Sequence, residues 1–195
     1  MYGIVPIAGL AGAAVIVRAM QREFPSAPLI GVGAVVVHGG RVLLVQRGRE
    51  PLKGHWTLPG GLLEVGEALT AGVAREVLEE TGLAVEPLEL IELLDRIHRE
   101  GDRVRYHYVI ADYLCRVTSG ELHAGSDAAA ARWVERAEWN SHSALVLDPI
   151  TARVLEKGWQ RTEQLKSEQP EVNQAHNGKA ARRCLRLELG PGLDP

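Results

Sequence analysis

Three glutamates that lie close together in the sequence, Glu76, Glu79 and Glu80, are the first candidates for chemistry. If their segment is an α-helix, spacings of three and four residues place the three carboxylates on one face. Carboxylate oxygens grouped in this way are the ligands that a hard divalent cation such as Mg2+ or Mn2+ prefers. The simpler interpretation is a solvated acidic face on which Arg75 and Glu79 form an i,i+4 ion pair. Because that interpretation leaves the grouping of like charges unexplained, we favour a metal site.

The residues around these glutamates predict the helix that must position them. Gly60 and Gly61 precede it and can bring backbone carbonyls close to an ion without obstruction by a side chain. Thr70 is the expected N-cap of a helix that begins at about Ala71, and Gly82 is its expected end. The face next to the acidic one is predicted to pack on a sheet and consists of Val73, Ala74, Val77 and Leu78.

Strands are expected on both sides of this helix. The runs 29–38 and 41–47 are joined by two glycines, which predicts a hairpin with a nearly all-apolar, buried first strand. The runs 88–98 and 103–117 predict a second, longer hairpin, and 131–135 predicts one more short strand.

A closing helix is expected over 148–164, with Asp148 as its cap and Pro149 as its first residue. The polar sequence after it predicts a disordered tail over 163–195. Residues 1–27 are expected to be an N-terminal extension to which no role is assigned. Its first 17 residues carry no charge, but they lack a basic flank and are too short to cross a bilayer, so no membrane span is predicted.

Composition favours one globular domain, cysteine usage favours a cytoplasmic location, and a small-molecule partner stays open. The chain has 195 residues, 46% of them hydrophobic, and a formal net charge of -3. Such a balanced charge gives no reason to expect a nucleic acid or an anionic membrane as the partner. Cys115 and Cys184 are far apart in the sequence, which predicts neither a disulfide framework nor a zinc site.

The acidic segment also matches a known motif. From Gly61 to Leu83 the chain follows the pattern G-x5-E-x7-R-E-U-x-E-E-x-G-U, where U is apolar, which is the signature of the Nudix hydrolases. A chance match at these nine positions is expected about once in a billion starting points. The chain resembles this family from about Pro28 to Gln160. The resemblance implies an α/β fold, a Nudix-type α/β/α sandwich with a mixed β-sheet, and a Nudix domain over 28–162.

The resemblance also implies an activity and the residues that carry it. Nudix hydrolases cut the pyrophosphate of a nucleoside diphosphate linked to another moiety by attack of water on phosphorus, with Mg2+ or Mn2+. The resemblance implies that Glu76, Glu79 and Glu80 are the metal ligands and catalytic groups. Gly60 would offer a carbonyl to the ion, and Glu67 would act through its water shell. Arg75 would orient the glutamates.

Several assignments stay open at this stage. The general base is Glu121, Asp127 or a motif glutamate. Arg47 either contacts phosphate or is an ordinary charge at a strand end, and Trp56 either stacks on a base or packs in the core. The proline typical of ADP-ribose enzymes is replaced by the region of His98, so the nucleotide-type substrate is not specified. A homodimer is left open, and the alternative function is a ligand-sensing Nudix domain without catalysis.

Overall fold

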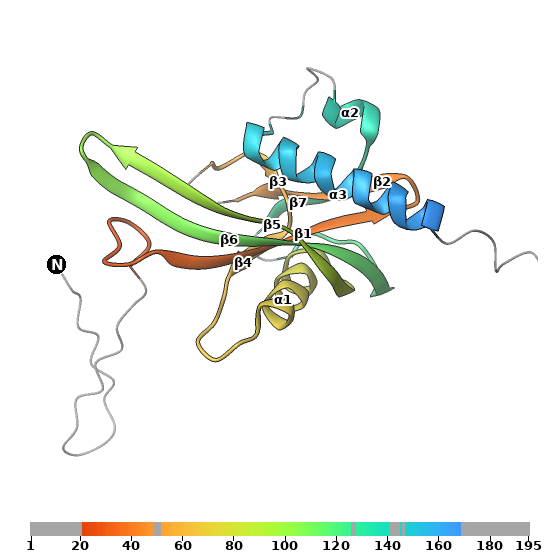
Figure 1. Ribbon diagram of the computed structural model, residues 1–195, viewed down its shortest axis with the longest axis horizontal. Helices are drawn as coiled ribbons and strands as arrows, with labels where there is room; N and C mark the ends of the chain where they lie inside the picture. The colour runs from red at the N-terminus through yellow and green to blue at the C-terminus, as the bar shows by residue number, and fades with distance from the viewer. Residues whose placement is uncertain (1–20, 49–51, 126–127, 141–144, 146, 169–195) are drawn as a thin grey trace, which may run out of the picture. The chain divides into compact units, whose positions relative to one another are not determined.

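The computed structural model describes residues 21–48, 52–125, 128–140, 145 and 147–168, and these contain strands and helices in the order of an α/β protein (Figure 1). The elements are β1 (Leu29–His38), β2 (Arg41–Arg47), β3 (Trp56–Thr57), β4 (Gly60–Leu62), α1 (Leu69–Thr81), β5 (Leu83–Glu100), β6 (Arg103–Gly120), β7 (Ala128–Glu135), α2 (Arg136–Asn140) and α3 (Pro149–Glu168). Residues 1–20 of the predicted extension and residues 169–195 of the predicted tail lie outside the described residues. The tail was expected to begin at residue 163, which was wrong, because α3 continues to Glu168.

Strand β1 is the common member of the sheet. One edge of β1 pairs in parallel with β6, from Leu29 opposite Tyr108 to Val36 opposite Cys115. The other edge pairs antiparallel with β4 along its first half and with β2 at its end. Strand β2 also pairs with β3 and β7, and β6 pairs with β5. The predicted mixed sheet is therefore confirmed, and both predicted hairpins form.

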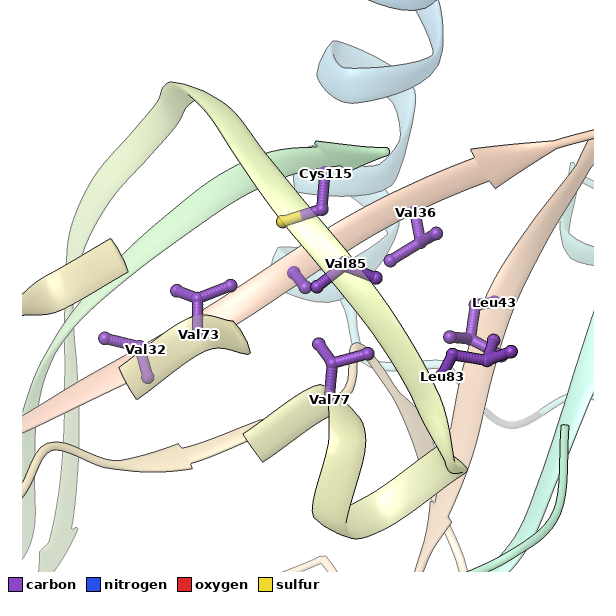
Figure 2. Close-up of a cluster of buried hydrophobic side chains, with 9 residues drawn as sticks. Val32, Val36, Leu43, Val73, Val77, Leu83, Val85 and Cys115 are labelled. Carbon is purple, nitrogen blue, oxygen red and sulfur yellow. The ribbon is translucent and has the colours of Figure 1, made fainter. Parts of the chain in front are cut away.

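Helices cover both faces of this sheet because the side chains of β1 alternate between them. Val32, Ala34 and Val36 belong to the same buried cluster as Val73 and Val77 of α1 (Figure 2). Val35 points to the opposite face, where a Cβ atom on Gly158 of α3 would lie 2.5 Å from its Cγ1. The arrangement is the α/β/α sandwich expected from the sequence (Figure 1).

Two expectations for α1 were wrong. Thr70 does not cap the helix, which begins at Leu69 with Ala68 in the N-cap position and without a side-chain cap. Leu69 packs against the buried cluster, so an apolar contact starts the helix two residues before the expected start at Ala71. Leu78 was expected to pack on the sheet but is 52% exposed. Its neighbour Val77 is fully buried.

Other boundaries extend the predicted ones. Gly82 ends α1 as expected, and its amide donates to the carbonyl of Leu78 at 2.9 Å. Strand β5 begins directly afterwards at Leu83, and β7 begins at Ala128 rather than at residue 131. Asp148 caps α3 as predicted, since its carboxylate accepts from the amides of Ile150 and Thr151. No helix among the described residues has the length and apolar character needed to span a bilayer.

The packing of α1 predicts unequal costs for truncating two adjacent side chains. Val77→Ala should lower the free energy of unfolding by about 2 kcal/mol, because it leaves a cavity in a closely packed cluster. Leu78→Ala should cost less than half as much, although it removes more atoms, since Leu78 is largely exposed. Urea unfolding of both variants measures the difference. A larger cost for Leu78→Ala would mean that α1 packs through the face expected from the sequence.

Candidate active site

The short strand β4 brings the two glycines against β1 and α1. Gly60 lies opposite Gly33 and Gly61 lies opposite Val32 in the β1–β4 pair. A Cβ atom on Gly61 would lie 2.4 Å from Oε2 of Glu76, so a side chain at this position would displace that carboxylate. The amide of Gly60 donates to Oε2 of Glu80 at 2.9 Å. The glycine pair thus holds two of the three motif glutamates against the end of the sheet.

Arg75 connects the loop before α1 to the acidic face of the helix. Its Nε and Nη2 donate to the two carboxylate oxygens of Glu67, each at 2.9 Å. Its Nη1 donates to Glu76 at 2.9 Å and to Glu79 at 3.3 Å. Nη2 also donates to the carbonyl of Leu62 at 3.1 Å. All five N–H groups of the guanidinium are therefore used. The ion pair between Arg75 and Glu79, which the simpler solvated-face interpretation had included, is present.

The same contacts set the charge states of the site. Hydrogen bonds from Arg75, and then from the Glu64 amide, lower the pKa of Glu67 from 4.5 to about 2. Burial raises the pKa of Glu76, and the hydrogen bond and charge of Arg75 partly oppose this shift. Glu79 is 58% exposed. Arg75 therefore offsets the repulsion among closely spaced carboxylates that the sequence suggests.

The donor set suits a hard divalent cation, because it consists of carboxylate oxygens with backbone carbonyls close by. Among the described residues, however, no three His, Cys, Asp or Glu side chains are already grouped to hold a metal ion. Glu76 and Glu79 accept hydrogen bonds from Arg75, and Glu80 accepts one from Gly60. A cation would have to compete with these donors for the glutamate oxygens.

A cleft of about 1210 Å³ collects most of the predicted site residues. Gly60, Glu76, Glu79 and Glu80 line it, and so does Arg47 at the end of β2. Arg75 and Glu67 are not part of its lining; they are hydrogen-bonded to each other and support the glutamates from outside the cleft. The acidic stripe and the candidate phosphate-binding arginine therefore face one space.

Two other candidates among the described residues do not line this cleft. Trp56 is absent from it, and its ring instead faces the Arg132 guanidinium, whose carbon lies 5.0 Å from the ring centroid. Glu121 is also absent from the lining; its carbonyl lies 3.0 Å from Nδ1 of His123. Asp127 lies outside the described residues. Of the candidate bases, the motif glutamates are those that the structure places at the cleft.

The cleft also contains polar residues that the sequence analysis did not select. Arg96 of β5, Asp112 of β6 and Asp148 line it together with Tyr108. Arg96 forms an ion pair with Asp148, and Asp112 is only 5% exposed. A signal for Asp112 was available, since it is the single charged residue in the apolar run YVIADYLC. The role of Arg96 depends on pairing across the sheet and has no such local signal.

The Arg75 contacts predict a clear loss when the guanidinium is replaced. Arg75→Lys keeps the charge, but a lysine ammonium has three donors and cannot reproduce the five bonds. We expect the free energy of unfolding to fall by about 1–3 kcal/mol, which urea unfolding measures. Arg116→Lys is the control, because Arg116 and its partner Glu86 are both exposed. Equal stability of Arg75→Lys and the wild type would contradict the connecting role of Arg75.

The lowered pKa of Glu67 predicts how the stability of the protein depends on pH in acid. Its folded-state pKa lies below the unfolded value, so its contribution to stability is complete above about pH 4.5 and is lost toward pH 2. Glu67→Gln should therefore be less stable than the wild type at pH 7, and the gap should close between pH 4.5 and pH 2. Unfolding free energies across this range measure the gap. A gap that stays constant down to pH 2 would show that Glu67 is not the ionised partner of Arg75.

Comparisons with known proteins agree with this geometry. The family model of the NUDIX domain matches residues 27–157. An ADP-ribose pyrophosphatase of Methanocaldococcus jannaschii is 33% identical over 108 residues, which cover 55% of this chain and 62% of that protein. A MutT-like protein of Streptomyces ambofaciens is 35% identical over 128 residues, which cover 64% of this chain and 77% of that protein.

A solved structure shows the same architecture. The crystal structure of the MutT NUDIX hydrolase from Burkholderia pseudomallei superposes with a TM-score of 0.59 and 32% sequence identity. The superposition covers 68% of this chain and 98% of that one. The family match includes β1 to β7 and the first turns of α3, and thus the cleft with its three glutamates. On the motif, the fold and these matches, the chain belongs to the Nudix hydrolase family.

Proposed function

We propose that this chain hydrolyses the pyrophosphate bond of a nucleoside diphosphate linked to another moiety, and that it requires Mg2+ or Mn2+. One observation carries the proposal, namely that Glu76, Glu79 and Glu80 line the same cleft as Arg47. Its volume of about 1210 Å³ leaves room for a substrate larger than a single nucleotide. A merely solvated acidic face would not open into such a space.

The residues of the chain divide the work of hydrolysis. Glu76, Glu79 and Glu80 would hold the cation with the Gly60 carbonyl, while Glu67 holds Arg75 in place. A bound cation would supply charge that neutralises phosphate oxygens and promotes ionisation of water. Arg47 contacts a phosphate oxygen. A motif glutamate accepts the proton of the attacking water as the new P–O bond forms and the bridging oxygen leaves with the other phosphate.

Glu79 suits the proton-accepting role best among these glutamates. It is the one whose carboxylate is largely exposed, and it lines the cleft. Glu76 is more buried and accepts from Arg75 at 2.9 Å, a shorter contact than the 3.3 Å between Arg75 and Glu79, and Glu80 accepts from Gly60. The candidate Glu121 does not line the cleft, which leaves Asp127 as the untested alternative from the loop before β7.

Relatives support a nucleotide-type substrate without identifying it. The matched M. jannaschii protein is named an ADP-ribose pyrophosphatase, and the match covers 62% of its length. We therefore include ADP-ribose, nucleoside triphosphates and nucleotide sugars in one panel and measure phosphate-containing products with Mg2+, with Mn2+ and with chelator. Metal-dependent turnover of at least one substrate supports the proposal. Saturable binding without turnover would instead support a ligand-sensing domain.

The proposed role of Glu80 as a metal ligand predicts how its replacement changes activity and stability. Glu80→Gln keeps the shape of the side chain but removes the charge that holds the cation, so turnover at limiting Mg2+ should fall at least about 100-fold. The variant should fold and should show a smaller rise in Tm on addition of Mg2+ than the wild type. Full turnover of Glu80→Gln at limiting Mg2+ would overturn the ligand assignment.

A matched control separates this effect from a general loss of negative charge. Glu64→Gln makes the same chemical change in the loop before α1, at a side chain that does not line the cleft. We expect it to keep both turnover and the Mg2+-dependent shift in Tm. Equal losses in Glu64→Gln and Glu80→Gln would mean that overall charge, rather than coordination, controls metal binding.

A further inference from the structure

A second acidic position in the cleft lies on the face of the sheet covered by α3. Asp112 of β6 is paired with Gly33 of β1, and both residues line the cleft. A Cβ atom on Gly33 would lie 2.1 Å from Oδ1 of Asp112, so a side chain there would push the carboxyl away. The absence of a side chain at Gly33 therefore makes the space that the Asp112 carboxyl occupies.

The Asp112 carboxyl has no hydrogen-bond donor among the described residues, although it is only 5% exposed. The nearby cation Arg96 is ion-paired with Asp148. Asp148 in turn accepts from Ile150 and Thr151 at the start of α3. A buried polar group that lies at the wall of a cleft and has no donor in the described part of the chain is positioned to meet a ligand.

The groups around Asp112 favour its neutral form. Glu92 of β5 and Asp148 before α3 oppose a negative charge at this position, and only Arg96 favours it. Arg153 and Lys157 of α3 are bound to Glu92, and Gly33 of β1 has no side chain that could contribute. Burial has the largest effect and raises the pKa of Asp112 to about 7.

A neutral carboxylic acid differs from a carboxylate in what it can recognise. The neutral form has one O–H donor beside one acceptor, whereas the ionised form has acceptors alone. A buried neutral acid can therefore donate to a ligand, as catalytic sites in other proteins show. Its complement is a ring nitrogen next to an amino group, which is the edge that adenine and cytosine present. Guanine presents two adjacent N–H donors and suits the ionised form.

We propose that Asp112, buried in the cleft wall opposite Gly33, is a specificity-determining residue that binds the amino-bearing edge of an adenine or cytosine base of the substrate. This inference rests on the proposed function, because it assumes that a nucleotide occupies the cleft. Arg96 and Gly33 act as positioning residues, since one holds Asp148 away from the base and the other leaves room for the Asp112 carboxyl.

Binding measurements on the full chain test this inference without requiring turnover. Isothermal titration with AMP, CMP, GMP and ribose 5-phosphate at pH 6 and pH 8 compares bases of different edges with a sugar phosphate that has no base. Because the neutral fraction of Asp112 falls with pH, the affinity for AMP or CMP should fall about tenfold between pH 6 and pH 8. Ribose 5-phosphate corrects for titration of the phosphate, and GMP should show no such loss.

Two variants separate recognition from packing. An amide has a donor beside an acceptor, so Asp112→Asn should bind AMP or CMP at pH 8 as well as the wild type does at pH 6. A leucine side chain has neither group. The affinity of Asp112→Leu for AMP or CMP should therefore fall about tenfold or more at both pH values, while its affinity for ribose 5-phosphate should be unchanged. Both variants should keep the wild-type Tm or raise it, since each removes a buried acid without a donor.

The outcomes distinguish this inference from the proposed function. If the substrate panel shows turnover but neither AMP nor CMP loses affinity with pH, or if Asn and Leu behave alike, the role of Asp112 is refuted and hydrolysis stands. If the panel shows no turnover but the affinity for AMP or CMP falls with pH as expected, Asp112 recognises the base of a bound regulator and the hydrolytic proposal fails. Tighter binding of GMP at pH 8 than of AMP at pH 6 also overturns the assignment.

Discussion

The five hydrogen bonds of Arg75 are the constraint on which the rest of the site depends. Two go to Glu67 and one to the Leu62 carbonyl, so the β4–α1 loop is tied to the helix. The other two go to Glu76 and Glu79, which allows like charges to share one helix face without a cation. A flexible loop and a repulsive acidic stripe become one rigid unit, because a planar guanidinium matches several carboxylates at fixed angles.

Two acids of the site, one in the cleft wall and one outside the lining, therefore meet opposite conditions. Glu67, bound on both oxygens by Arg75, has its pKa lowered to about 2, whereas burial without a donor raises the pKa of Asp112 to about 7. The protein thus keeps a supporting carboxylate ionised and a wall carboxyl neutral at the same pH. Such a separation is how one site can combine electrostatic binding of a cation with hydrogen-bond donation to a ligand.

The sequence predicts local features of this fold better than contacts that join distant segments. The Gly39–Gly40 turn, the Gly82 stop and the Asp148 cap were confirmed because each depends on neighbours within four residues. The expected start of α1 and the expected burial of Leu78 were wrong, because packing against the sheet determines which side of the helix is covered. The motif identified the glutamates, but whether Glu121 or Trp56 reaches the cleft depends on loop paths. Asp112 was missed because its position opposite Gly33 arises from pairing across the sheet.

The parallel pairing of β1 with β6 determines when this site can come into existence. Paired residues of the two strands, such as Leu29 and Tyr108, are 79 positions apart in the sequence, whereas β5 and β6 are neighbours joined by a tight turn. Closing so long a loop is slow compared with forming a local hairpin. During synthesis, α1 and its glutamates emerge before β6. Strand β1 therefore has no parallel partner until β6 has emerged. Catalytic competence is thus acquired late in folding, when the ends of this loop meet.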